Sequence, residues 1–357
     1  MEKYALVLSG GGARGAYQIG AWQALRELNI PIDIVTGTSV GALNGCLVAQ
    51  DAFDEAVELW NRIETHTVFD VNQNSNKVSL KTGTSGLAEI IRTYANEDNI
   101  RHSAREFGLV MVQYPDLKPH YLFVDDIEEG KLHDCILASA SFFPALEAVE
   151  IDGMKFMDGG YADVMPVKMA VDRGADHVIA VYLDGLGRVR RGRLKAAEQS
   201  AKSMRIIQSH WNLGDVLSFD LDNTKRIMRL GYLDTMKAFE KYDGFKFTFE
   251  KDIFNEHQLF GADAAADAFG LDPLVIYNKA TLIERLQIEV ANSPVSDVKT
   301  LPLENLKDHL GSKALVTFIA IDLQKREADS IFLSRPAFNL FKKEIQAANF
   351  LINLGIL

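Results

Sequence analysis

The sequence predicts an α/β fold of three layers, in which helices cover both faces of a mostly parallel central sheet. Short apolar runs of strand length, such as residues 4–8 and 178–183, alternate with longer stretches whose apolar residues recur at helical spacing. The short runs are apolar throughout, which is typical of parallel strands buried on both faces. After about residue 190 helical spacing dominates. We therefore expect a mainly α-helical C-terminal region in addition to the α/β part.

The composition is that of a globular protein. The 357 residues are 47% hydrophobic and 24% charged, and this length indicates one large domain or two. The two cysteines, Cys46 and Cys135, predict neither a disulfide framework nor a cysteine-based zinc site, which suits a reducing cytosol. The net charge of −11 argues against nucleic acid as a partner.

The apolar runs are also too short for targeting or anchoring segments. The first residues lead directly into a glycine motif instead of a signal peptide, and no run approaches the roughly 18 apolar residues of a membrane span. We expect a cytoplasmic protein, for which peripheral contact with a membrane stays open.

Each element of the α/β part follows from local pattern. The strand at residues 4–8 ends in glycines, and the helix that follows has its apolar residues mostly on one face. Further apolar runs predict strands, and further amphipathic or small-residue stretches predict helices. The expected strands are residues 4–8, 32–35, 109–113, 120–124, 155–157 and 178–183, and the expected helices are residues 13–28, 52–64 and 135–143.

Residues 71–86 are polar and rich in Asn and Ser, which predicts a surface loop. The loop contains the sequence G-T-S-G at residues 83–86. Because this sequence lacks the final spacing of a serine nucleophile motif and no strand precedes it, we interpret Ser85 as a turn or cap residue.

A stronger serine motif lies at residues 37–41, where G-T-S-V-G fits the pattern G-x-S-x-G. In this motif a strand ends, the chain turns sharply and a helix begins, which leaves the serine exposed at the turn. Glycines are needed at both flanks because side chains there would collide with the neighbouring strand or helix. The motif predicts Ser39 as a nucleophile, although by itself it also fits an ordinary turn with Ser39 as helix N-cap.

A glycine loop, G-G-G-A-R-G at residues 10–15, follows the first strand. Its unshielded N–H groups at a helix N-terminus would form an anion site or, beside Ser39, an oxyanion hole. The same hexamer matches the dinucleotide fingerprint. That fingerprint needs an acidic residue at the end of the second strand, whereas Asp33 precedes the strand, so we disfavour a nucleotide.

The general base is predicted to be a carboxylate and not an imidazole. Asp158 follows a short apolar stretch and precedes two glycines that form a tight turn. Desolvation would raise its pKa and its basicity, although a turn aspartate in a hairpin is the alternative. No histidine lies in a comparable setting. The eight histidines are His66, His102, His120, His133, His177, His210, His257 and His309.

The glycine loop, the serine motif and D-G-G at residues 158–160, in that order, resemble the patatin-like phospholipase family. Residues 138–144, A-S-A-S-F-F-P, also resemble a helix-and-proline segment of that family. The resemblance covers residues 4–185. It implies a Ser–Asp dyad without a catalytic histidine, and hydrolysis of lipid acyl esters without a metal or another cofactor.

The resemblance and the motifs together assign roles to individual residues. We expect Ser39 as nucleophile and Asp158 as general base, acting through an acyl-enzyme intermediate. The expected oxyanion hole consists of Gly10, Gly11, Gly12, Arg14 and Val40, with Arg14 orienting the loop or adding positive charge. The glycines expected to support the motifs are Gly15, Gly37, Gly41, Gly159 and Gly160.

The predicted function is therefore a phospholipase or lysophospholipase acting on lipid or acyl-ester substrates. The alternatives are a catalytically idle lipid- or protein-binding module of the same fold and, less favoured, a nucleotide-binding enzyme. A basic cluster at residues 188–195 marks the expected boundary between an acyl hydrolase domain, residues 1–187, and a helical region, residues 188–357. That region would be a lid, a cover or an oligomerisation surface, and the oligomeric state stays open.

Overall fold

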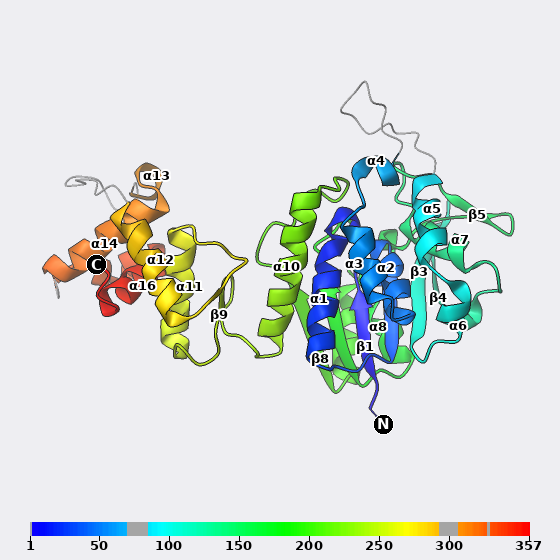
Figure 1. Ribbon diagram of the computed structural model, residues 1–357, viewed down its shortest axis with the longest axis horizontal. Coiled ribbons are helices and arrows are strands. Elements are labelled where there is room, and N and C mark those ends of the chain that lie inside the picture. Colours follow the sequence, from blue (N-terminus) through cyan, green and yellow to red (C-terminus); the bar gives the residue numbers. More distant parts are fainter. Residues whose placement is uncertain (1, 70–84, 293–305, 327–328) are drawn as a thin grey trace, which may run out of the picture. The chain divides into compact units, whose positions relative to one another are not determined.

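The computed structural model describes residues 2–69, 85–292, 306–326 and 329–357 (Figure 1). Its contacts divide the chain into two compact units, Met1–Ala238 and Phe239–Leu357, which are described separately below. The loop expected at residues 71–86 lies almost entirely outside the described residues. Its last two residues begin helix α5 (Ser85–Tyr94).

The first unit is built on an eight-stranded, mostly parallel sheet, which confirms the predicted fold class. The strand order is β5-β6-β3-β2-β1-β7-β8. β2 and β6 pair with different parts of the same edge of β3, and β4 pairs with the opposite edge. Each strand expected from the sequence is present. The strands are β1 (Tyr4–Leu8), β2 (Ile34–Thr38), β3 (Glu106–Tyr114), β4 (Lys118–Phe123), β5 (Val149–Ile151), β6 (Met154–Asp158), β7 (His177–Tyr182) and β8 (Ser203–Gln208).

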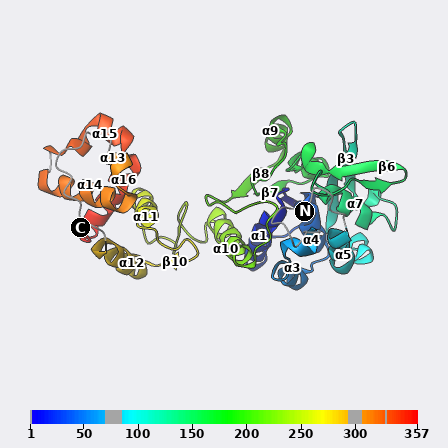
Figure 2. The ribbon, with the colours of Figure 1, turned by 90° about the horizontal axis from the view of Figure 1, so that it is seen from above.

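Helices cover both faces of this sheet. Ala5 and Val7 of β1 pack on one face with α8 and α9, and Figure 2 shows α9 on the opposite side of β7 and β8 from α1 and α10. Helix α2 is buried along its whole length, as its apolar composition requires. The longer helices of this unit, apart from α5, are α1 (Ala16–Glu27), α2 (Val40–Ala49), α3 (Phe53–Trp60), α7 (Leu132–Ala140), α9 (Arg191–Ser200) and α10 (Leu221–Ala238), and the shorter ones are α4 (Thr65–Val68), α6 (Glu97–Arg101) and α8 (Val167–Asp172).

The register of β3 brings the ends of two strands together. β2 runs parallel to β3 and ends with Thr38 opposite Val110. β6 runs antiparallel to β3 and ends with Asp158 opposite Met111. β2 and β6 share one edge of β3, since β4 pairs with the same β3 residues from the other edge. The residue after β2, which is Ser39, and the last residue of β6 therefore meet at this edge.

The sheet and its helical cover continue beyond residue 187, where the sequence analysis placed a boundary. β8 pairs in parallel with β7, and α10 packs along α1. The backbones of these two helices lie so close that a Cβ at Gly231 would be 2.0 Å from the Tyr17 carbonyl oxygen. Pattern analysis missed β8 because this edge strand exposes most of its side chains and so shows no buried apolar run.

The second unit is mainly helical, as predicted. Its two short strands, β9 (Thr248–Phe249) and β10 (Ile276–Tyr277), pair in parallel. Its helices are α11 (Glu256–Ala268), α12 (Lys279–Ala291), α13 (Leu306–His309), α14 (Ser312–Arg326), α15 (Arg335–Leu340) and α16 (Lys342–Asn353). Within the described parts of the chain, none of the helices combines the length and the apolar character needed to cross a membrane.

Candidate active site

Ser39 occupies a sharp turn between β2 and α2. Its φ of 59° and ψ of −129° lie in a region that non-glycine residues rarely adopt, and such strain is concentrated at functional sites. A Cβ at Gly37 would lie 2.1 Å from the Gly41 carbonyl oxygen, and one at Gly41 would lie 2.1 Å from the Leu8 carbonyl oxygen. Only glycine fits at either flank. The strained serine is thus enclosed by backbone on both sides.

A hydrogen-bond chain from α7 supports this turn. The Ser39 N–H donates to Ser139 Oγ at 3.1 Å, and Ser139 Oγ donates to the Val110 carbonyl at 2.7 Å. Ser139 lies in the small-residue segment at residues 138–144 that the sequence analysis singled out. That segment therefore connects the serine turn to β3.

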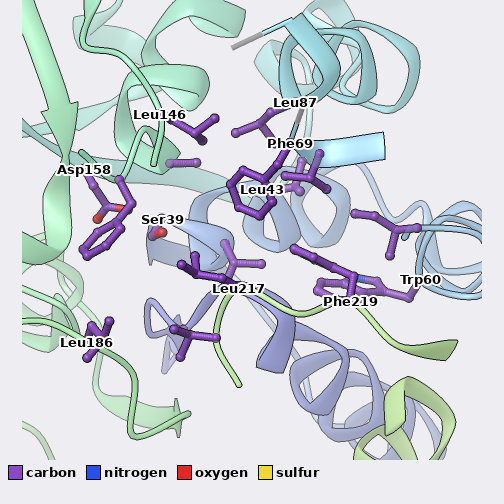
Figure 3. Close-up of a pocket in the computed structure, with 18 residues that line it drawn as sticks. Ser39, Leu43, Trp60, Phe69, Leu87, Leu146, Asp158, Leu186, Leu217 and Phe219 are labelled. Carbon is purple, nitrogen blue, oxygen red and sulfur yellow. The ribbon is translucent and has the colours of Figure 1, made fainter. Parts of the chain in front are cut away.

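Asp158 lies beside Ser39 and is only 3% exposed. Burial raises the pKa of Asp158 to about 6, while hydrogen bonds from the Ser39 hydroxyl and the Gly160 N–H act in the opposite direction. The Gly160 N–H donates to Asp158 Oδ1 at 2.7 Å. Figure 3 shows the two side chains at one edge of a cavity. A carboxylate with this pKa is a better proton acceptor than an exposed one and is still ionised at neutral pH.

Three backbone N–H groups without partners lie at the same cavity. Gly11, Gly12 and Val40 line it together with Ser39, and within the described residues none of their N–H groups donates a hydrogen bond. Gly12 has a φ of 54°, and a Cβ there would lie 2.0 Å from the Val216 carbonyl oxygen. The loop therefore takes this shape only with glycine at that position. Its free donors suit an anion formed beside Ser39.

Two residues expected in the oxyanion hole point elsewhere, which corrects that part of the expectation. The Gly10 N–H donates to the Val164 carbonyl at 2.9 Å and is thus already engaged. The Arg14 side chain donates to the carbonyls of Gly214, Leu183 and Asp184 at 2.8, 3.2 and 2.6 Å. Arg14 therefore orients the glycine loop, which was one of its two expected roles, and adds no donor to the cavity.

The cavity beside Ser39 encloses about 730 Å³, including its open mouth, and its walls are mostly apolar (Figure 3). Besides the residues discussed above, it is lined by Leu43, Trp60, Ile63, Val68, Phe69, Leu87, Ala140, Phe142, Leu146, Leu186, Val216, Leu217 and Phe219. Among the residues that the structure describes, no histidine lines it. The chemistry present here is that of a hydroxyl, a buried carboxylate and free amides beside an apolar chamber.

Aromatic side chains held in fixed positions form one side of the cavity. Trp60 Nε1 donates to Asn44 Oδ1 at 2.9 Å, which fixes the indole ring. The Phe219 ring centre lies 6.1 Å from that of Trp60 and 6.2 Å from that of Phe69. The ring contacts and the Trp60 hydrogen bond together hold this wall in place.

Part of the cavity wall comes from residues 213–219, which we call the strap, between β8 and α10. Val216, Leu217 and Phe219 of the strap line the cavity. Hydrogen bonds along its length fix the strap, among them Arg14 to the Gly214 carbonyl, the Ala13 N–H to the Val216 carbonyl at 2.8 Å, and the Phe219 N–H to Thr65 Oγ1 at 2.9 Å. Sequence analysis missed the strap because its apolar residues follow no periodic pattern.

In the part of the chain that the structure describes, no three His, Cys, Asp or Glu side chains gather in a way that could hold a metal ion. Cys46 and Cys135 are both buried as free thiols, and burial raises the pKa of each to about 12. The thiols are therefore protonated at neutral pH and poor ligands or nucleophiles.

Comparison with known proteins finds a matching family, relatives that are similar in sequence, and solved structures that are similar to this one. Residues 6–171 match the model of the family Patatin-like phospholipase. The chain is 33% identical over 181 residues to Lysophospholipase nte1 of Aspergillus terreus, and 30% identical over 198 residues to Lysophospholipase NTE1 of Debaryomyces hansenii. These alignments cover 49% and 50% of this chain, and the chain spans only 12% of each relative's length.

Two solved structures are also similar, each at 13% identity and a TM-score of 0.41. VipD from Legionella pneumophila is matched over 99% of this chain and 91% of its own, and the type III effector protein ExoU over 100% and 69%. The family match covers the glycine loop, the serine turn and the Asp158 turn. Residues 6–171, which carry the candidate site, therefore match the patatin-like phospholipase family.

Proposed function

We propose that this chain is a serine lipid acyl hydrolase of the phospholipase or lysophospholipase type, acting through a Ser39–Asp158 dyad. One observation carries the proposal: the strained Ser39 and a buried carboxylate of raised pKa, Asp158, lie together at one edge of an apolar cavity (Figure 3). The lysophospholipase names of the relatives support a lipid ester as substrate. We likewise keep residues 1–187 as the proposed acyl hydrolase domain, with the strap and α10 as additions to it.

In the acylation step, Asp158 takes the proton of the Ser39 hydroxyl as Oγ attacks the ester carbonyl. The negative charge that forms on the carbonyl oxygen accepts hydrogen bonds from the N–H groups of Gly11, Gly12 and Val40. When the tetrahedral intermediate collapses, the C–O bond to the alcohol breaks and the alcohol takes the proton from Asp158. The acyl group is then bound to Ser39.

Deacylation repeats these steps with water. Asp158 accepts a proton from a water molecule, whose oxygen attacks the acyl carbonyl beside the same three N–H groups. The bond to Ser39 Oγ breaks, Oγ recovers the proton from Asp158, and the fatty acid leaves. The apolar cavity holds the acyl chain during both steps, since burying a methylene contributes about 0.8 kcal/mol.

Labelling with a fluorophosphonate tests this proposal directly. Such a probe reacts with a serine only when a base and an oxyanion site activate it. We expect covalent modification of Ser39, located by peptide mass spectrometry, together with hydrolysis of a p-nitrophenyl acyl ester. A folded chain that is labelled on another residue, or on none, would contradict the assignment.

The pKa of Asp158 predicts the pH dependence of the reaction. As the base, Asp158 must be ionised in the free protein, so kcat/KM should rise with pH through about 6 and then level off. Asp163 is also buried with its pKa raised to about 6, and its carboxylate accepts a hydrogen bond from the Tyr121 hydroxyl at 3.1 Å. Asp163→Asn is therefore the control, and its profile should keep the rise near 6. Loss of this rise in Asp163→Asn would mean that the titration belongs to Asp163 and not to Asp158.

The strap predicts which acyl chains fit. Phe219→Ala enlarges the chamber, so the optimum in a series of p-nitrophenyl esters should move to longer chains. Each methylene that finds room should gain roughly fourfold in kcat/KM, from about 0.8 kcal/mol per buried methylene. Phe53→Ala is a matched control, because the Phe53 ring packs on Trp22 at 5.1 Å and does not line the cavity. An unchanged optimum in Phe219→Ala would show that the strap does not limit chain length.

A further inference from the structure

Large apolar side chains are exposed on the same unit as the cavity. The side chains Tyr114, Leu117, Phe143 and Leu186, which we call the apolar rim, are between 48% and 60% exposed. Exposed apolar side chains that cluster in this way mark interaction surfaces, whereas isolated ones are ordinary.

The apolar rim is continuous with the cavity. Leu186 lines the cavity itself, and Phe142, which also lines it, stacks its ring on Tyr161 at 5.6 Å. The Tyr161 hydroxyl donates to the Phe143 carbonyl, and the Phe143 ring centre lies 6.5 Å from that of Tyr114. The apolar surface thus leads from the chamber outward over the ends of β3 and β6.

Leu117, three residues after Tyr114, extends the apolar rim. Leu117 lies in the turn between β3 and β4 with a φ of 55° and is 51% exposed. This conformation suits Gly, Asn or Asp and is costly for leucine, and an exposed leucine gains little from packing. Folding alone does not account for an apolar side chain at this turn.

Charges of both signs border the apolar rim. Asp116 and Lys118 flank Leu117, and Glu150 lies opposite Lys155 in the pairing of β5 with β6. The basic cluster at residues 188–195 begins two residues after Leu186, so that end of the apolar rim carries an excess of positive charge. Around the rest of the rim, charges of both signs give no strong field for anionic partners, and binding there depends on apolar burial.

We propose that the apolar rim docks the protein onto the surface of a zwitterionic phospholipid bilayer. This inference rests on the proposed function, because a lipid must pass from the membrane into the chamber that the rim borders. A protein bound on the same surface would cover the mouth through which substrate enters, whereas a bilayer there supplies the substrate. Insertion of Leu117, Phe143 and their neighbours among the acyl chains would place the mouth at the depth of the ester bonds.

Cosedimentation with vesicles tests the docking separately from catalysis. The full chain carrying Ser39→Ala is mixed with phosphatidylcholine vesicles, and the bound fraction is measured at low and high salt. We expect binding that changes little with salt, and a loss of about tenfold or more in affinity for the double variant L117D/F143D. Asp suits the left-handed φ at residue 117, so this change spares the fold. Ile206→Asp is the control, since Ile206 is 46% exposed on β8 at the opposite edge of the sheet.

The outcomes separate docking from the proposed chemistry. Equal vesicle binding by L117D/F143D and the parent chain, or an equal loss in Ile206→Asp, would overturn the docking. So would conversion of a dimer to a monomer by L117D/F143D without a change in vesicle binding, because the rim would then cover a second copy of the chain. With Ser39 present, L117D/F143D should hydrolyse a soluble short-chain p-nitrophenyl ester as fast as the parent. If neither chain hydrolyses it while the double variant still loses vesicle binding, the proposed function fails and the docking stands.

Discussion

Replacing Ser39 with alanine is expected to lower kcat for an acyl ester by about 10,000-fold or more. Without Oγ no acyl-enzyme forms, and water must attack the ester directly beside the remaining N–H donors. The backbone of the turn should persist, because Gly37, Gly41 and the hydrogen bond to Ser139 hold it independently of the hydroxyl. Circular dichroism and thermal unfolding should therefore match the parent chain, while fluorophosphonate labelling is lost.

Ser141→Ala is the matched control for this experiment. Ser141 is buried, its hydroxyl donates to the Leu137 carbonyl of α7 at 2.7 Å, and it does not line the cavity. We expect turnover within a few-fold of the parent, since the hydroxyl touches no reacting group. Appreciable turnover by purified Ser39→Ala would eliminate Ser39 as the nucleophile.

Asp158→Asn is expected to lower kcat by about 1,000-fold or more, since the amide cannot accept the serine proton. The same change should stabilise the fold at neutral pH. The folded protein raises the pKa of Asp158 from its ordinary 3.8 to about 6, so it binds this proton more tightly than the unfolded chain does. Stability from this group is therefore fully present below about pH 4 and is lost as pH rises through about 6, a cost of about 3 kcal/mol.

The amide in the Asp158→Asn variant carries no such cost, so the difference in stability between variant and parent should depend on pH. Between about pH 4.5 and pH 8, the free energy of unfolding should shift in favour of Asp158→Asn by about 2 kcal/mol. Chemical denaturation at the two pH values measures this shift. A variant that loses activity without gaining relative stability at high pH would mean that Asp158 is not a desolvated carboxylate in the folded protein.

Short sequence motifs could propose those parts of the candidate site that depend on local backbone. Ser39 and Asp158 each lie at a turn that glycines determine, so short motifs were enough to propose them. Gly10 and Gly11 are equivalent in sequence, yet the Gly10 N–H is taken by Val164, a residue far along the chain. Which amides stay free depends on tertiary contacts that the motif does not contain.

The apolar chamber was even harder to predict from the sequence, because its wall residues come together only in the tertiary structure. Trp60 and Phe219 come from segments with no shared pattern, and each is fixed by a polar partner, Asn44 and Thr65 respectively. β8 was missed for a related reason, because an exposed edge strand does not show the buried apolar run that identified β1 and β7. Periodicity finds elements that bury a face, and it does not find the loops that close a cavity.

The strap lies outside residues 6–171, the stretch shared with the family. In the proposed enzyme, the dyad and most of the chamber wall thus belong to the stretch that matches the family, and a short downstream segment completes the wall against which the fatty acid fits. Natural variation or engineering at residues 213–219 would then change which lipids are consumed while the reaction itself stays the same.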